Sequence, residues 1–288
     1  MGLDINGTRF LLYARRQGVD FSRTAMIGRQ CLTLNAAVLE RNLWDFGFAG
    51  GARECERLLT CENGYAEPFL RLLGASEIAS FDASDYEGAN FIHDFNLPLH
   101  PRFFGRYTTV LDGGTLEHIF NFPQAIANCM RMVDTGGHFL GITPTNNFVG
   151  HGFYQFSPEV FFRVFNSSNG FTLQQMFAFE SHNTNWYEVA DPAVVKERVT
   201  LINGRETYLL ITARKTADVP AFASQIQQSD YSVIWQAGLL PGVSSRGAGR
   251  WNFLPAPLKW PVRAARGWIH GRRRLGFDGK WFRKLQVP

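Results

Sequence analysis

Two stretches decide the fold: YTTVLDGGTLEHI at residues 107–119 and DTGGHFLGITP at residues 134–144. Each contains a short run rich in β-branched and apolar residues, YTTVL in the first and HFLGIT in the second, and each run ends at residues typical of turns. Between them, residues 123–133 begin with a proline and repeat apolar side chains at helical spacing. The order strand, helix, strand predicts a parallel sheet with crossover helices.

The same alternation extends outward in both directions along the chain. Upstream we predict a first strand with its turn, a helix, a second strand and a short third strand, at residues 24–34, 65–73, 77–81 and 90–93. Downstream we predict a helix and two further strands, at residues 158–165, 171–179 and 208–213. The whole pattern predicts an α/β fold, a Rossmann-like, doubly wound, mostly parallel seven-stranded sheet with helices on both faces.

The alternation also suggests where the domains lie. Residues 1–216 are predicted to form the sheet domain and residues 217–288 a C-terminal extension. Inside the domain, residues 35–63 interrupt the pattern with predicted helices at 36–45 and 53–59, separated by a glycine-rich break. We interpret this segment as an insertion after the first strand.

The formal net charge of +4 is unevenly distributed. Residues 246–288 contain eleven Lys or Arg and one acidic residue, a local charge of +10, so the rest of the chain carries −6. The same segment holds four of the seven tryptophans, namely Trp251, Trp260, Trp268 and Trp281. Basic residues with interfacial aromatics suit an anionic membrane surface. The alternative is a solvated extension whose tryptophans pack back on the domain.

Several classes of protein are excluded by features that the sequence lacks. No run approaches the roughly 18 apolar residues of a membrane-spanning helix, and the first residues do not resemble a signal peptide. The four cysteines form no C-x-x-C pair and the histidines have no metal-ligand spacing, so we expect neither a disulfide framework nor a metal site. Phosphate-loop and nucleophile-elbow motifs are also missing. We expect a cytoplasmic protein, peripheral at the inner face of the membrane if the extension binds lipid.

Glycines and polar residues follow the predicted strands. In a doubly wound sheet, ligands bind outside the carboxyl ends of the strands, near the point where the strand order reverses. The residues at these ends are Gly28, Gln30, Asp82, Asp94, Asp112 and Gly113. A carboxylate after the second strand is well placed to accept hydrogen bonds from a ribose diol. An aspartate after a strand is also ordinary turn chemistry, and this alternative stays open for each of the three.

These segments together resemble a known family. The two opening stretches resemble the fourth and fifth strands of the Rossmann-like S-adenosylmethionine-dependent methyltransferases. EIASFDASDYEG at residues 77–88 is similar to their second strand with its ribose-binding acid, and FIHDFNLPL at 91–99 to the loop whose aspartate lies near the adenine. With GHGFYQFSPEVFF at 150–162, the order resembles a bacterial subgroup associated with surface polysaccharides or glycoconjugates. The resemblance covers about residues 20–216.

The resemblance implies S-adenosyl-L-methionine as cofactor. It places Asp82 on the ribose, Asp94 near the adenine, and Gly28 and Gln30 at the methionine end. Phe95, Asp112 and Gly113 are also implied as cofactor-binding residues. The sequence departs from the family in the first turn, where MIGRQC at residues 26–31 has one glycine in place of a GxGxG pattern.

The segment NNFVGHGFYQFSPE at residues 146–159 is the predicted acceptor side of the site. A neutral histidine or a carboxylate can remove the proton of an acceptor hydroxyl. His151, flanked by glycines, is the first candidate for this base, followed by His118 and Glu117. The alternative role for His151 is to cap backbone groups of its loop, and His118 could simply support its turn.

The predicted function is methyl transfer to a hydroxyl of a sugar, glycolipid or other small-molecule acceptor. The alternative is a catalytically degenerate Rossmann-like binding or assembly module, docked to an anionic membrane surface through residues 246–288. A nicotinamide-dependent oxidoreductase ranks last because the G-x-G-x-x-G turn is missing. Nucleic acid is not the expected partner.

Overall fold

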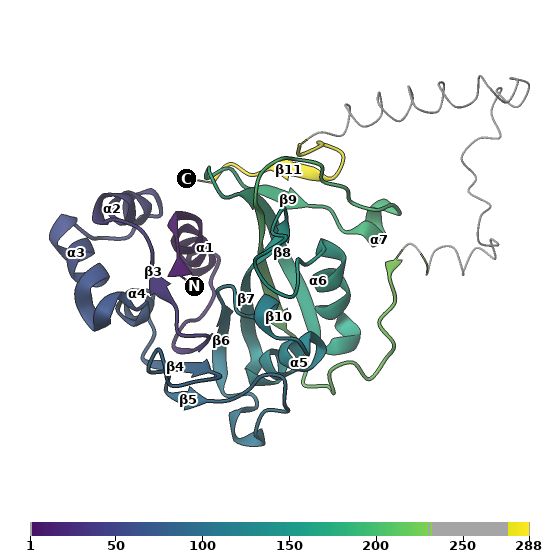
Figure 1. Cartoon of the computed structure of the whole chain (residues 1–288), viewed down its shortest axis with the longest axis horizontal. Coiled ribbons are helices and arrows are strands. Elements are labelled where there is room, and N and C mark those ends of the chain that lie inside the picture. Colours follow the sequence, from purple (N-terminus) through teal and green to yellow (C-terminus); the bar gives the residue numbers. More distant parts are fainter. Residues whose placement is uncertain (1, 230, 232–275, 288) are drawn as a thin grey trace, which may run out of the picture.

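The computed structural model describes residues 2–229, 231 and 276–287. Its main sheet contains nine strands: β2 (Arg23–Ile27), β4 (Glu77–Asp82), β5 (Phe91–Ile92), β6 (Tyr107–Asp112), β7 (Val133–Asn146), β8 (Phe171–Glu180), β9 (Tyr187–Val189), β10 (Thr207–Lys215) and β11 (Phe282–Lys284). Their order across the sheet is β11-β9-β8-β10-β7-β6-β2-β4-β5 (Figure 1).

The parallel half of the sheet is doubly wound. β2 pairs in parallel with β4 on one side and with β6 on the other, and the sheet continues in parallel from β4 to β5 and from β6 to β7. The chain therefore winds first in one direction from β2 and later in the other, which places the switch point between β2 and β6. β10 lies antiparallel between β7 and β8. The predicted Rossmann-like α/β fold is confirmed, and the short strands β9 and β11 extend its seven-stranded core.

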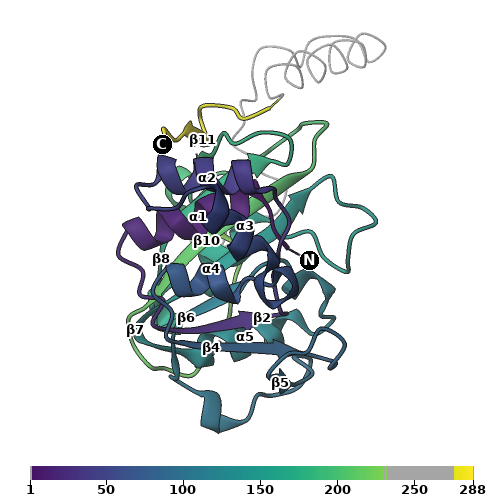
Figure 2. The same ribbon diagram turned by 90° about the vertical axis from the view of Figure 1, so that its left-hand side faces the viewer.

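Helices cover both faces of this sheet (Figures 1 and 2). The helices on one face are α1 (Ile5–Arg16), α2 (Ala36–Asp45), α3 (Ala52–Thr60) and α4 (Glu67–Leu72). The other face carries α5 (Phe122–Met132) and α6 (Pro158–Val164), and a short α7 (Pro192–Val195) follows β9. The remaining elements are the pair β1 (Gly2–Leu3) and β3 (Cys31–Leu32), and the 3₁₀ turns η1 (Cys61–Gly64), η2 (Pro101–Phe103), η3 (Leu116–His118) and η4 (Ser167–Asn169).

The central strands are buried on both sides. Ala25 and Ile27 of β2 belong to the core beneath α5 and α6, whereas Met26 between them belongs to the core beneath α1 to α4. Neighbouring residues of a strand point to opposite faces, so a strand covered on both sides needs an unbroken apolar run. This is why β2, β6 and β7 could be recognised in the sequence without strict alternation.

Helix α1 was missed by the sequence patterns. Its buried residues include Asn6, Thr8 and Arg9, which obscure an apolar stripe. Asp4 caps the helix by accepting a hydrogen bond from the backbone N–H of Gly7 at 2.8 Å. Asn6 bonds to Asn183 and Trp186, and Arg9 pairs with Asp45, and no local pattern can predict partners this far along the chain.

Most predicted boundaries agree with the structure, with two informative exceptions. The predicted first strand, residues 24–34, divides into β2 and β3 around the turn at Gly28. Residues 134–137 (DTGG), whose composition is typical of a turn between the predicted helix and strand, are instead part of β7, where a Cβ on Gly137 would lie 2.7 Å from the carbonyl oxygen of Thr108. The glycine there allows two strands to approach closely rather than ending one of them.

The end of the predicted extension belongs to the sheet. β11 pairs antiparallel with β9 (Figure 1). Trp281, the residue before β11, is 3% exposed. Trp281 donates a hydrogen bond from its indole Nε1 to Glu197 at 2.9 Å. The prediction of four interfacial tryptophans is therefore wrong for Trp281, which packs into the core. Trp251, Trp260 and Trp268 lie outside the described residues.

None of the helices in the described part of the chain is both long enough and apolar enough to cross a membrane.

Candidate functional site

The first turn of the sheet is built around Gly28. Its φ of +71° lies in the left-handed region, and its N–H donates to the carbonyl of Phe81 at 2.7 Å. A Cβ at this position would lie 2.4 Å from Oγ1 of Thr115. Glycine is therefore required here by the backbone angle and by the close approach of Thr115, a contact within the chain itself.

Gln30 lies at the switch point, between the ends of β2 and β6. Its side chain is buried, and Nε2 donates to the carbonyl of Ile27 at 3.1 Å. Its Oε1 has no hydrogen-bond partner among the described residues, and a Cβ on Gly113 would lie 2.5 Å from this oxygen. Gln30 thus fills the space beside Gly113 and presents an unpaired acceptor in the crevice where this fold binds ligands.

Two of the predicted acids lie at neighbouring strand ends. Asp82 ends β4 and is half-buried; its Oδ1 accepts from the backbone N–H of Ser84 at 3.1 Å. Asp94 follows β5 and is exposed, and hydrogen bonds donated by the backbone and side chain of Asn96 lower its pKa. Both carboxylates are at the carboxyl edge of the sheet, as the strand pattern predicted.

Two other predicted cofactor residues have clear structural partners. Asp112 is 1% exposed, and its Oδ1 accepts hydrogen bonds from the backbone N–H groups of Thr115 and Leu116 at 2.9 and 3.3 Å. Phe95 is 4% exposed and contacts Phe81 edge-on, with ring centroids 6.1 Å apart. Asp112 fixes the turn after β6, and Phe95 belongs to the core, so any role of these side chains toward a ligand stays a prediction.

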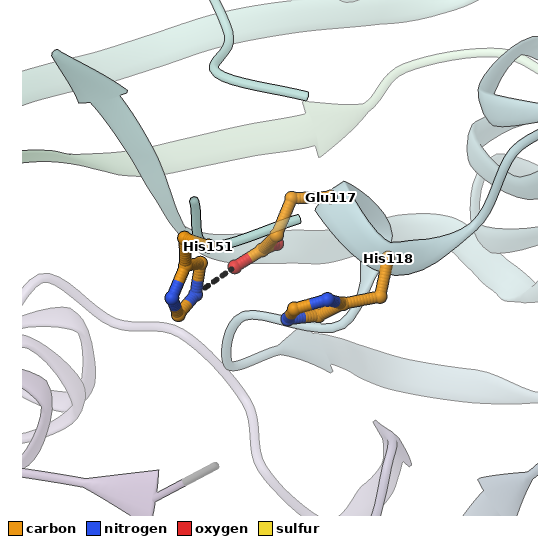
Figure 3. Close-up of side chains that lie close together, drawn as sticks. All are labelled: Glu117, His118 and His151. Atoms are coloured by element: carbon orange, nitrogen blue, oxygen red, sulfur yellow. Dashed lines mark ion pairs between the residues drawn. The ribbon is translucent and has the colours of Figure 1, made fainter. Parts of the chain in front are cut away.

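The three predicted acceptor-side residues lie close together (Figure 3). One ligand atom from each of Glu117, His118 and His151 lies within 4.8 Å of the other two. Nε2 of His151 is 3.6 Å from Oε1 of Glu117, and the two imidazole centroids are 5.1 Å apart. The side chain of Glu117 is fully buried and that of His151 is 31% exposed. The cluster therefore has a buried carboxylate and more accessible imidazoles.

The loop that carries His151 is held against η3. The carbonyl of Glu117 accepts hydrogen bonds from the backbone N–H groups of Phe153 and Tyr154 at 2.9 and 3.2 Å. A Cβ on Gly152 would lie 2.9 Å from that same carbonyl oxygen. The loop can approach η3 this closely because residue 152 is a glycine, and this approach brings His151 to Glu117.

Burial governs the charges of the cluster. Desolvation raises the pKa of Glu117, and the nearby carboxyl of Asp112 raises it further. Burial also lowers the pKa of His118, with a smaller contribution from His151. Both shifts favour the neutral forms of Glu117 and His118.

The sequence spacing did not predict a metal-type cluster, because His151 is remote from Glu117 and His118 along the chain. It also missed Arg29, which shapes the first turn of the site. Arg29 donates from Nε to Glu67 at 2.7 Å and from Nη1 to the carbonyl of Glu87 at 2.9 Å, so it ties the first turn to the loop after β4. An arginine next to the sole glycine of that turn was the available signal.

Comparisons with known proteins give a distant likeness. No protein-family model matches the chain, and no curated protein matches it. A putative methyltransferase from Bacillus halodurans has a TM-score of 0.43 and 11% identity, covering 72% of this chain and 99% of that chain. An S-adenosylmethionine-dependent methyltransferase from Aquifex aeolicus has a TM-score of 0.36 and 7% identity, covering 72% and 92%.

A third similar structure is the branched-chain polyamine synthase of Thermus thermophilus in complex with N4-aminopropylspermidine and 5′-methylthioadenosine. Its TM-score is 0.38 at 12% identity, over 78% of this chain and 61% of that chain. Likenesses at these TM-scores and identities assign neither a family nor an activity. The fold is assigned from the strand order and pairing described above.

Proposed function

We propose that the chain is an S-adenosyl-L-methionine-dependent methyltransferase that acts on a hydroxyl of a sugar, glycolipid or other small molecule. The observation that carries this proposal is the arrangement at the carboxyl edge of the sheet. Asp82 and Asp94 lie on one side of the switch point, and the Glu117, His118 and His151 cluster follows the strands on the other side. Nucleoside-type ligands bind at this edge in doubly wound sheets.

The residues at the switch point fit the cofactor chemically. Asp82 is half-buried, and its Oδ2 has no partner among the described residues, so the carboxylate can accept hydrogen bonds from a ribose diol. The free Oε1 of Gln30 suits the ammonium group of the methionine end. Because the Gln30 side chain occupies the space beside Gly113, this end of the ligand must displace the side chain or bind against it.

His151 is the proposed general base. When bound, the cofactor supplies a sulfonium methyl group, which moves to the acceptor oxygen as its bond to sulfur breaks and the electron pair stays on sulfur. Nε2 of His151 faces the carboxyl group of Glu117 at 3.6 Å, which leaves the other ring nitrogen available to the acceptor. The other ring nitrogen can then accept the proton of the acceptor hydroxyl.

The proposal is tested by binding of S-adenosylhomocysteine to the full-length protein, measured by calorimetry. Loss of a charged hydrogen bond costs about 1.5–3 kcal/mol, so we expect Asp82→Ala to weaken binding about 10- to 100-fold. Asp20→Ala is the matched control, because Asp20 also accepts from the N–H two residues on, at 2.9 Å, before the opposite end of β2. Absence of binding by the wild-type protein would refute the proposal.

A second ligand separates the two ends of the cofactor site. 5′-Methylthioadenosine contains the nucleoside but not the amino-acid end of the cofactor. We expect Gln30→Ala to weaken S-adenosylhomocysteine roughly 10-fold and to leave methylthioadenosine unchanged, whereas Asp82→Ala weakens both ligands. Equal losses for both ligands in Gln30→Ala would place Gln30 away from the methionine end.

The buried side chain of Gln30 occupies the space beside Gly113, where the methionine end of the cofactor is expected to bind. This observation also favours a second candidate function, a catalytically degenerate binding or assembly module. This module would dock on an anionic membrane surface through residues 246–288, most of which lie outside the described residues. We expect such a protein to bind vesicles that contain anionic lipid and not to bind S-adenosylhomocysteine. Unchanged vesicle binding after deletion of residues 246–275 would remove this candidate.

A further inference from the structure

We propose that Glu117, His118 and His151 bind one divalent transition-metal ion. The inference deepens the proposed function, on which it rests for its chemical role but not for its test. The sequence predicted no metal site, and only the fold brings these three side chains together (Figure 3).

The first observation is a pair of buried polar atoms that face each other without bonding. Oε1 of Glu117 and Nε2 of His151 are both buried and have no hydrogen-bond partner among the described residues. Their separation of 3.6 Å is too long for a hydrogen bond. Two donors that bind one zinc ion tetrahedrally are about 3.3 to 3.6 Å apart, given metal–ligand bonds of about 2.0–2.2 Å. The gap thus fits a shared cation.

The second observation is the chemistry of the donor set. Two imidazoles and one carboxylate form a set typical of zinc and of other first-row divalent ions, whereas magnesium and calcium prefer oxygen donors alone. Three protein ligands leave coordination positions open, which is characteristic of catalytic rather than structural metal sites. His118 and His151 are both partly accessible, so the open positions can face an entering ligand.

The third observation is that the donors are held in place from behind. Oγ1 of Thr143 lies 3.5 Å from Oε2 of Glu117, the carboxylate oxygen that does not face His151. Phe148 contacts the ring of His151 edge-on, with centroids 5.2 Å apart, and its N–H donates to Oε1 of Gln155 at 2.7 Å. Supporting contacts of this kind orient metal ligands before the ion binds.

A bound ion would alter how the acceptor hydroxyl is activated. An oxygen that enters an open coordination position loses its proton more readily, because the ion stabilises the resulting alkoxide. The proton then passes to bulk water, and His151 acts as a ligand instead of as the base. A divalent ion bound to the carboxylate of Glu117 would have a net charge of +1, which one alkoxide would neutralise. The expected methyl acceptor is therefore a compound with a hydroxyl oxygen that can coordinate the ion.

The test is zinc binding to the chelator-treated, full-length protein without cofactor, measured by calorimetry. We expect one zinc ion per chain, and at least ~100-fold weaker binding in Glu117→Gln and in His151→Asn, because loss of even an outer-sphere partner costs about 10- to 100-fold. Cobalt absorption in the visible range gives a second measurement, which we expect to change in both variants. Circular dichroism establishes that each variant is folded.

The matched control is His182→Gln. His182 and Glu180 form a similar pair at 3.7 Å nearer the surface, and among the described residues no third potential ligand joins them in a cluster. Equal zinc affinities of the wild-type protein and Glu117→Gln would overturn the inference, as would an equal loss in His182→Gln. Failure here is distinct from failure of the proposed function, because S-adenosylhomocysteine binding is measured on the metal-free protein.

Discussion

Asp112 illustrates how one residue at the carboxyl edge can have a structural role where the sequence predicts a ligand. Its carboxylate is buried and accepts two backbone hydrogen bonds in the turn that leads to Glu117. Burial raises its pKa, so the folded protein resists ionisation of this group more than the unfolded chain does. The charge is therefore costly to stability, while the hydrogen bonds are favourable.

This balance predicts a pH-dependent effect of Asp112→Asn. The amide keeps an acceptor for Thr115 and Leu116 but removes the buried charge. The unfolded chain ionises near its usual pKa of about 3.9, so wild-type stability falls as pH rises above that value toward the raised folded-state pKa. We expect Asp112→Asn to be more stable than wild type by on the order of 1 kcal/mol at pH 8, and by less at pH 5, in urea unfolding.

Asp112→Ala is the contrasting variant, because it removes the acceptor as well as the charge. We expect a loss of about 1–3 kcal/mol from the two unpaired amide groups. If the stability gain of Asp112→Asn did not change with pH, ionisation of Asp112 could not be the cause of the lower stability of the wild-type protein.

At the scale of elements, the candidate site depends on the contact between η3 and the loop that follows β7. Residue 152 lies against the carbonyl of Glu117, whereas nothing lies within 4 Å of a Cβ placed on Gly150. The two glycines flank His151 in the sequence. Only at Gly152 would a side chain collide with a neighbouring group.

We expect Gly152→Ala to displace the loop and with it His151. Overpacking costs about 1–3 kcal/mol, and misplacement of a catalytic group by about 1 Å costs on the order of 100-fold in rate. Zinc affinity and methyl transfer should both fall in Gly152→Ala and stay unchanged in Gly150→Ala. Identical behaviour of the two variants would show that the loop contact does not position His151.

The docking of α1 is a second contact between elements. Oδ1 of Asn6 accepts from Nε1 of the buried Trp186 at 2.9 Å, and Nδ2 of Asn6 donates to the carbonyl of Asn183 at 3.0 Å. These bonds join the first helix to the segment before β9. They explain why an asparagine is buried where an apolar residue would be expected.

We expect Asn6→Ala to destabilise the protein by about 1–3 kcal/mol, because it leaves the buried indole N–H of Trp186 without an acceptor. Equilibrium unfolding in urea measures the loss. Asn185→Ala, at an exposed position beside Trp186, should change stability by less than about 0.5 kcal/mol. Similar losses in both variants would remove the assigned role of the Asn6 bond.

At the scale of the whole molecule, the C-terminal end of the chain belongs to the main sheet. β11, from the last residues of the sequence, lies at the far edge from β5, and it covers the free edge of β9. Trp281 contributes the buried side chain that holds this strand. The C-terminal end is thus part of the folded domain, although the sequence composition assigned it to the extension.

We expect Trp281→Ala to lower the free energy of unfolding by about 3–5 kcal/mol, the usual cost of removing a buried tryptophan side chain. Lys284→Ala, at an exposed position in β11, should cost less than about 0.5 kcal/mol. Thermal unfolding of the full-length variants measures both effects. Comparable stability of Trp281→Ala and wild type would mean that β11 contributes little to the fold.

The sequence by itself determined the parallel half of the sheet, the helices α2 and α5, and the strand ends with Asp82 and Asp94. These features depend on local spacing: an apolar run, a proline or glycine at its end, and a repeat of 3.6 residues. It also determined which residues to consider as acceptor-side candidates, because Glu117, His118 and His151 follow predicted strands.

The tertiary structure alone decided the roles of the residues within that framework. Only the folded chain brings His151 to Glu117, places Gln30 against Gly113, buries Asn6 against Trp186 and returns Trp281 to the core. Each of these contacts joins residues from different elements, and several join distant parts of the chain. Their partners are fixed by packing and by the need to satisfy buried polar groups, which have no signature in local sequence.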